Sequence, residues 1–193
     1  MGLAAKAAVE RARAQVASLI HCLPEENIFT SGGSESNNMV LKGVAHTYKH
    51  KGKHIITAQT EHPAILKPCK YLEDLGYEVR YVPVDRYGMV DPSFIESLIT
   101  EKTILVTIMH SSNEVGTLQP IKEIGRMCKA RGVLFHTDAS QSVGKVPIDV
   151  TTLGVDFLTI AGHNLYAPKG VGALYIRGGL HIEPLIHGAG QGL

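Results

Sequence analysis

Short apolar runs alternate with amphipathic segments along most of this chain. Runs rich in β-branched and aromatic residues predict strands at 27–30, 54–58, 78–83, 103–110, 133–137, 156–160 and 172–177. Helical periodicity predicts helices at 3–22, 34–50, 63–75, 91–99 and 120–130, and Ser34, Pro63, Asp91 and Pro120 suit helix starts. Such alternation is typical of an α/β fold with a largely parallel sheet.

Both ends of the pattern are abrupt. The chain starts inside a helical segment with no strand before it, and it stops at H-G-A-G-Q-G-L after a strand-like run. A sheet cut in this way exposes edges and apolar faces that another segment normally covers. We therefore expect residues 1–193 to form a single domain that is incomplete at both ends.

Composition narrows the class of protein. With 193 residues, 44% hydrophobic and 19% charged, the chain can bury a real core. A formal net charge of +1 and scattered Lys and Arg residues argue against nucleic acid as a partner. No apolar run approaches the roughly 20 residues that cross a bilayer, so we expect no membrane association. Small-molecule chemistry or protein partners are the remaining expectations.

The cysteines and histidines give no metal signature. Cys22, Cys69 and Cys128 lack CxxC or Cys/His spacing, and no pair among the ten histidines has ligand spacing such as H-E-x-x-H. The sequence therefore predicts no metal site and no disulfide framework. An odd number of cysteines fits a reducing compartment, which favours a cytoplasmic location. Cys69 and Cys128 fall within helical patterns and are expected to be packing residues.

Polar motifs fall where predicted strands end and helices begin, the usual place for ligands in open α/β sheets. The first is F-T-S-G-G-S-E-S-N-N at 29–38, where Gly33 lets the backbone approach an anion and the helix start favours a phosphate. The alternative is that Ser34 only caps the helix. The second is T-E-H-P-A at 60–64, where His62 can stack on a planar ring and exchange protons, or be a surface loop histidine.

Three further motifs follow. In M-H-S-S-N-E-V-G-T-L-Q-P at 109–120, Asn113 can donate to a ring oxygen or a carboxylate, or stabilise a turn. In F-H-T-D-A-S-Q-S-V-G-K at 135–145, a strand brings Asp138 to a position we expect to be buried, which calls for a cationic partner such as a pyridinium nitrogen. Gln141 can reach a neighbouring ring oxygen, and the alternative for Asp138 is a turn cap. Segment 161–177 places His163 just after a strand and before a glycine-rich turn.

In order and spacing, these five motifs resemble the class V aminotransferase family of pyridoxal 5′-phosphate (PLP) enzymes, and within it the cysteine desulfurase and selenocysteine lyase group. The resemblance runs from about Gly2 to Gln191. It implies a three-layer PLP-transferase large domain with a mostly parallel mixed sheet flanked by helices. It also implies release of sulfur or selenium from cysteine or selenocysteine to give alanine, a homodimer, and a sulfur-acceptor protein as partner.

The resemblance also implies roles for single residues. Gly33 and Ser34 would bind the PLP phosphate, with His163 adding a contact there, and His62 would stack on the pyridine ring and assist proton transfer. Asp138 would pair with the pyridine nitrogen. The remaining cofactor-binding positions are Gln141 at the phenolic oxygen, Asn113 beside the cofactor and the substrate carboxylate, and Ala161 and Gly162 next to His163.

Asn164 departs from the family pattern, which has a lysine directly after this histidine to form a Schiff base with the cofactor. A carboxamide cannot do so, because its nitrogen lone pair is delocalised. Lys169 belongs to the separate P-K-G turn and is not expected to replace it. We therefore expect PLP to bind without a covalent bond and the chain to be weakly active or inactive. A non-catalytic protein of sulfur trafficking and another class V reaction such as transamination are the alternatives.

Overall fold

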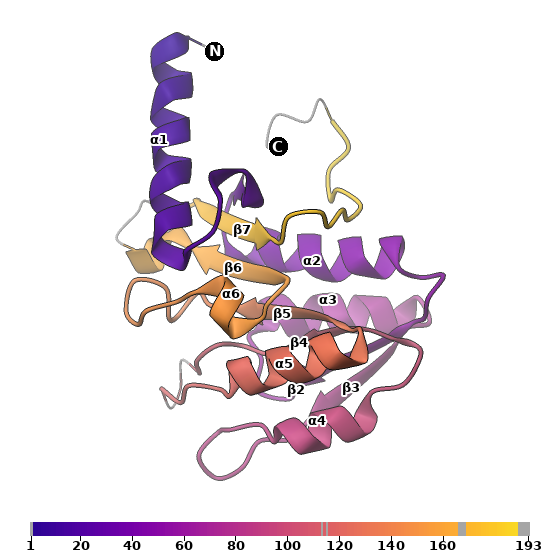
Figure 1. Ribbon diagram of the computed structural model, residues 1–193. Helices are drawn as coiled ribbons and strands as arrows, with labels where there is room; N and C mark the ends of the chain where they lie inside the picture. Colours follow the sequence, from indigo (N-terminus) through magenta and orange to yellow (C-terminus); the bar gives the residue numbers. More distant parts are fainter. Residues whose placement is uncertain (1, 113, 115, 166–168, 189–193) are drawn as a thin grey trace.

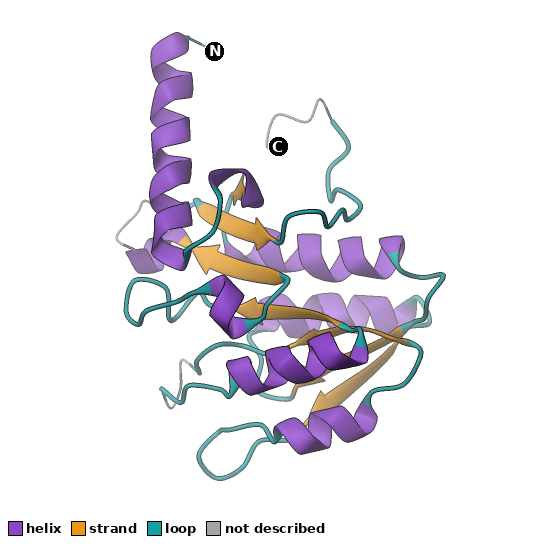
Figure 2. Ribbon diagram, in the orientation of Figure 1, coloured by secondary structure: helices purple, strands orange, loops and turns teal. Residues whose placement is uncertain are grey.

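The computed structural model describes residues 2–112, 114, 116–165 and 169–188, and within them a mixed sheet lies between two layers of helices (Figures 1 and 2). Its strand order is β1-β7-β6-β5-β4-β2-β3. The strands are β1 (Asn27–Thr30), β2 (His54–Ala58), β3 (Glu78–Val82), β4 (Thr103–Thr107), β5 (Leu134–Asp138), β6 (Phe157–Ala161) and β7 (Gly172–Ile176).

Strands β3, β2, β4, β5 and β6 run parallel to one another, and β7 runs antiparallel between β6 and β1. The predicted mostly parallel mixed sheet is therefore confirmed. The predicted strand 103–110 was too long, since β4 ends at Thr107. Beyond this point the N–H groups of Ile108 and His110 still donate to carbonyls of β5, but the N–H of Met109 donates to the Glu61 carboxylate at 2.7 Å.

Helices cover both faces of the sheet. They are α1 (Leu3–Ile20), α2 (Gly33–Thr47), α3 (Pro63–Asp74), α4 (Pro92–Leu98), α5 (Ile121–Arg131) and α6 (Val150–Leu153), with short 3-10 turns η1 (Pro24–Glu26) and η2 (Gly162–Leu165). Helices α2 and α3 lie on one face, and α4, α5 and α6 on the other (Figures 1 and 2). The sequence pattern did not predict α6, whose four residues are too few to show a period; it is stabilised by Asp149, which accepts from the N–H groups of Thr151 and Thr152.

Two apolar layers hold the helices to the sheet. Neighbouring residues of one strand point to opposite sides, as for Ile55 toward α2 and α3 and Ile56 toward α4 and α5. All five residues of β2, β4 and β6 are buried, as expected for strands covered on both faces. This packing makes the sheet a rigid support for the loops at its edge.

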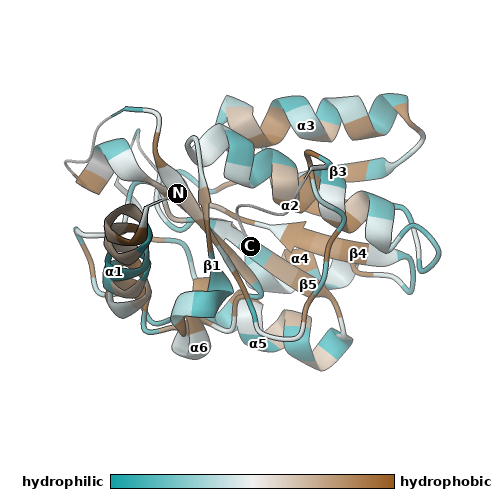
Figure 3. Ribbon diagram, turned by 90° about the horizontal axis from the view of Figure 1, so that it is seen from above, coloured by the Kyte–Doolittle hydropathy of each residue, from teal (hydrophilic) through white to brown (hydrophobic). Residues whose placement is uncertain are grey.

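Helix α1 lies mostly outside these layers. Only its last turns contact the body, through the buried Ala17 and Ile20, while Leu3 near its start is 90% exposed. Figure 1 shows the helix projecting from the sheet, and Figure 3 shows it at one side of the molecule. No described helix is both long enough and apolar enough to cross a membrane.

Candidate active site

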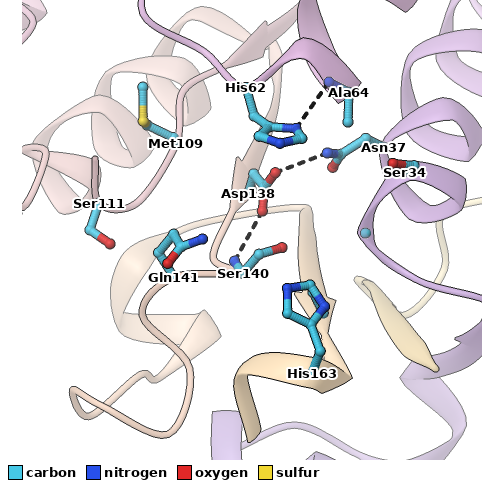
Figure 4. A pocket seen from close by; sticks show the side chains of 12 residues that line it. Ser34, Asn37, His62, Ala64, Met109, Ser111, Asp138, Ser140, Gln141 and His163 are labelled. Atoms are coloured by element: carbon cyan, nitrogen blue, oxygen red, sulfur yellow. Dashed lines mark hydrogen bonds between the residues drawn. The ribbon is translucent and has the colours of Figure 1, made fainter. Parts of the chain in front are cut away.

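A pocket opens at the carboxyl end of the parallel strands (Figure 4). Segments distant in sequence contribute to it: the first turns of α2, the start of α3, and the chain that follows β4, β5 and β6. Its lining residues are Gly33, Ser34, Asn37, His62, Ala64, Met109, Ser111, Asp138, Ser140, Gln141, Ala161 and His163. Seven of the residues predicted from sequence thus meet at one place.

The start of α2 depends on close backbone contacts. The helix begins at Gly33, and the residue before it, Gly32, has φ +153°, which favours glycine. A Cβ on Gly172 would lie 2.7 Å from the Gly32 Cα, and one on Gly33 would lie 3.2 Å from Ser140 Oγ. The interpretation of Ser34 as only the helix cap was wrong, because Gly32 holds the cap position and Ser34 lies in the first turn. The N–H groups of that turn have no partner within the helix and form an anion-binding feature.

Asp138 forms the floor of the pocket at the end of β5. Its Oδ2 accepts from Asn37 Nδ2 at 2.9 Å and its Oδ1 accepts from the Ser140 N–H at 3.0 Å. The carboxylate is half-buried rather than buried as predicted, because β5 ends at the open edge of the sheet. The Ser140 bond shows that Asp138 also stabilises the following turn. None of the ion pairs between described residues includes Asp138, so its charge can pair with a ligand cation.

His62 is held by the helix that it precedes. Its Nδ1 accepts from the Ala64 N–H at 3.1 Å and thereby caps α3. A neutral ring in this arrangement carries its proton on Nε2. The imidazole is exposed, and in Figure 4 it lies on the same side of the pocket as Asn37. It is therefore both a surface histidine and a lining residue of the pocket.

The segment after β6 forms the other side of the pocket. His163 lies in η2 and, in Figure 4, on the opposite side of Asp138 from His62. Ala161 also lines the pocket, whereas Gly162 is beside it and donates its N–H to the Val171 carbonyl at 2.8 Å.

Two of the predicted positions cannot be placed in the same detail. Asn164 belongs to η2 by its backbone, and its side chain lies outside the described part of the chain. Asn113 lies outside the described residues altogether.

Gln141 lies in a turn that is tied to the loop after β4. Ser142 Oγ is hydrogen-bonded to His110 Nδ1 at 2.7 Å and to Ser111 Oγ at 2.7 Å. Burial lowers the pKa of His110, so its ring is neutral at neutral pH. These contacts hold the backbone next to Gln141 in place, and Gln141 itself lines the pocket.

Asn37 and Glu61 were not predicted as site residues. Asn37 is 1% exposed and lies on α2 one turn after Gly33, so the i, i+4 spacing was the available signal. Glu61 is 4% exposed and lies directly before His62. Both roles depend on groups brought across the sheet, which the sequence alone does not place.

The cysteines do not contribute a nucleophile to the pocket. Cys69 and Cys128 are buried, as predicted, and burial raises the pKa of each thiol to about 12. Cys22 is half-buried and its pKa is raised to about 11, again chiefly by burial. None of them lines the pocket.

The groups that line the pocket together fit one kind of ligand. A helix start suits an anionic group, a carboxylate without a cationic partner suits a protonated ring nitrogen, and an imidazole can stack on a flat ring. A planar heteroaromatic ligand that carries a phosphate has all three properties, and PLP is such a ligand. The absence of a side chain at Gly33 also leaves room beside Ser140.

The sequence matches the family description "Aminotransferase class-V" over residues 1–191. The chain therefore belongs to the class V aminotransferase family.

Its named relatives are cysteine desulfurases. It is 53% identical over 190 residues to "Cysteine desulfurase IscS" of Dictyoglomus turgidum, covering 98% of this chain and 48% of the relative. It is 51% identical over 192 residues to the human "Cysteine desulfurase", covering 98% of this chain and 42% of the relative. The chain thus spans about half the length of the curated relatives it matches.

Solved structures agree with the observed fold. "SspA in complex with cysteine" superposes with a TM-score of 0.94 at 41% identity, covering 97% of this chain and 55% of that one. "NIFS-LIKE PROTEIN" superposes with a TM-score of 0.93 at 44% identity, covering 99% and 53%. The sheet and its helices are therefore those of the PLP-dependent cysteine desulfurase fold.

Proposed function

We propose that this chain is the cofactor-binding part of a PLP-dependent cysteine desulfurase, an enzyme that releases sulfur from cysteine and leaves alanine. The observation that carries the proposal is the convergence of predicted site residues from separate segments on one pocket. Membership of the family and the names of the relatives support the same reaction class.

In this proposal the first turn of α2, at Gly33 and Ser34, holds the PLP phosphate, with His163 nearby. Asp138 would pair with the ring nitrogen, Gln141 would hydrogen-bond the phenolic oxygen, and His62 would stack on the ring. Asn113 would lie beside the cofactor and the substrate carboxylate. PLP would supply an electron sink for charge that develops on the substrate. The chain would supply the binding and orientation.

Two residues have chemical roles that follow from their contacts. Asp138 accepts two hydrogen bonds, which fix the orientation of the carboxylate that would pair with the ring nitrogen. The Nδ1 of His62 accepts from the Ala64 N–H, so the neutral ring carries its proton on Nε2, and this N–H can donate to a group bound in the pocket.

Asn164 sets the limit on this chain's own activity. By the family pattern it stands at the Schiff-base lysine position, and a carboxamide forms no such bond. We propose that PLP binds without a covalent link and that turnover is weak or absent. Of the two substrates that the resemblance implies, we propose cysteine and not selenocysteine, because the relatives described above are named as cysteine desulfurases. A homodimer and a sulfur-acceptor protein belong to the same proposal.

The test combines reduction with product analysis. PLP is added to the purified chain, borohydride is applied, and the protein is examined by mass spectrometry, while alanine is measured after addition of cysteine. The proposal predicts PLP binding, no reduced lysine adduct and little alanine. A lysine adduct together with steady alanine production would restore the ordinary enzyme and contradict the role given to Asn164.

Asn164 also favours a second candidate, a non-catalytic protein that keeps the fold in order to bind an active homologue or a sulfur-trafficking partner. Co-purification and size-exclusion chromatography distinguish it. A complex of defined stoichiometry with a desulfurase subunit or a sulfur acceptor supports this candidate, and a lone monomer opposes it.

A further inference from the structure

Glu61 is a buried carboxyl group at the back of the site. It follows β2 and is 4% exposed. Its Oε1 accepts from the Met109 N–H at 2.7 Å. Its Oε2 is also buried and has no hydrogen-bond partner among the described residues. An ionised carboxylate left in this state loses hydration without replacing it.

The charges around Glu61 oppose ionisation. Asp138, at the end of β5, is the titratable group whose charge acts on Glu61, and Glu61 in turn raises the pKa of the Cys69 thiol on α3. His62 is next in sequence. Burial raises the pKa of Glu61 well above its usual range, the Met109 bond lowers it in part, and Asp138 raises it further. No ion pair among the described residues involves Glu61.

A second buried oxygen, that of the Asn37 side chain, also lacks a hydrogen-bond partner among the described residues. Asn37 is 1% exposed, and its Nδ2 donates to Asp138 Oδ2 at 2.9 Å. An ionised carboxylate only accepts hydrogen bonds, so this contact fixes which end of the amide faces Asp138. The Asn37 Oδ1 is then a buried acceptor with no donor among the described residues.

One proton would satisfy both atoms. Glu61 and Asn37 each leave one buried oxygen without a partner among the described residues, Asn37 is hydrogen-bonded to Asp138, and the charge of Asp138 acts on Glu61. We propose that Glu61 is a neutral carboxylic acid whose Oε2–H donates to Asn37 Oδ1, directly or through one buried water. The hydrogen-bonded chain then runs from the Met109 N–H through Glu61 and Asn37 to the Asp138 carboxylate.

Glu61 is on this account a positioning residue. It links the loop that carries His62 to the Asn37 amide, which in turn orients Asp138. In this way it holds the His62 loop and the Asp138 carboxylate in a fixed relative position. This role in cofactor binding rests on the proposed function, whereas the protonation of Glu61 does not. The two parts can therefore be tested separately.

The first experiment uses the chain without PLP. Infrared difference spectra at pH 7 compare wild type with Glu61→Gln and with the control Glu123→Gln, which changes an exposed glutamate. We expect wild type and E123Q to show a protonated-carboxyl band that shifts in D₂O and is absent from E61Q. Loss of a carboxylate band in E61Q, with no change in the protonated-carboxyl region, would overturn the proposal.

The second experiment measures PLP affinity by equilibrium dialysis. Glutamine can accept from Met109 and donate to Asn37, so E61Q is expected to bind within about twofold of wild type, whereas Glu61→Ala weakens binding about tenfold by leaving a buried polar group unpaired. An equal loss of PLP affinity in E61Q and E61A would contradict the proposal that Glu61 is a neutral acid. If E61A does not fold, E61Q and the infrared band decide. If no variant binds PLP, the proposed function fails and the infrared result still decides for Glu61.

Discussion

Acidification is expected to destabilise this domain through His136, which lies beneath the site two residues before Asp138. The ring is fully buried between two threonines: Nδ1 is 2.7 Å from Thr107 Oγ1 and Nε2 is 2.9 Å from Thr159 Oγ1. Burial lowers the pKa of His136 to about 4, and the nearby charge of Asp138 opposes part of this effect. The imidazole is therefore neutral in the folded protein at neutral pH.

The sign and size of the effect follow from proton binding. Between the unfolded pKa, about 6.5, and the folded value, the unfolded chain binds a proton that the folded chain does not, so the free energy of unfolding falls as the pH falls. The loss attributable to His136 is about 2 kcal/mol at pH 5 and about 3 kcal/mol at pH 4 relative to pH 7.

The assay is urea unfolding followed by circular dichroism between pH 7 and pH 4. Burial also lowers the pKa of His54 and His110 and raises that of Glu61, which contributes the opposite slope, so the decisive quantity is a difference. The stability of wild type minus that of His136→Asn is expected to fall by about 2 kcal/mol from pH 7 to pH 5. The control His181→Asn replaces an exposed ring. A constant difference between wild type and H136N over this range would refute the reasoning.

Two other predictions concern the candidate cofactor site and the close contact between Gly172 and Gly32 at the start of α2. Asn164→Lys is expected to give a PLP adduct that borohydride fixes to the new lysine, as shown by peptide mass spectrometry; an adduct on Lys169 alone would contradict the assignment of position 164. Gly172→Ala places a Cβ 2.7 Å from the Gly32 Cα and 2.9 Å from the Ile160 carbonyl oxygen, so it should lower the free energy of unfolding by about 1–3 kcal/mol in urea titrations. Gly188→Ala, which meets no atom within 4 Å, is the matched control, and equal stability of the two variants would argue against this close contact.

Hydrophobic periodicity was sufficient to locate the main helices and the strands of the sheet. Strand and helix ends shifted by one to three residues where tertiary contacts decide them, as after Thr107, where the N–H of Met109 donates to the Glu61 carboxylate. The four-residue α6 has no periodicity to detect and depends on the cap at Asp149. Ser34 has a good capping side chain, yet Gly32, which packs closely against Gly172, holds the cap position.

In the candidate site too, some residues could be predicted from the sequence and others could not. Residues at strand ends, such as His62 and Asp138, could be predicted because parallel strands bring their carboxyl ends to one edge. Asn37 and Glu61 could not, because their importance arises from buried atoms that meet across α2, α3 and the sheet. The half-exposed state of Asp138 likewise depends on how openly its strand ends.

The most direct test of the central claim is a PLP titration of the 193-residue chain beside its Asp138→Ala variant, by equilibrium dialysis with borohydride reduction of the bound fraction. We predict saturable binding of one PLP per chain, no covalent retention after reduction, and at least about tenfold weaker binding in D138A, the loss expected for a charge-assisted hydrogen bond. Absence of saturable binding by the wild-type chain, or equal affinity in D138A, would contradict the assignment of this pocket to PLP.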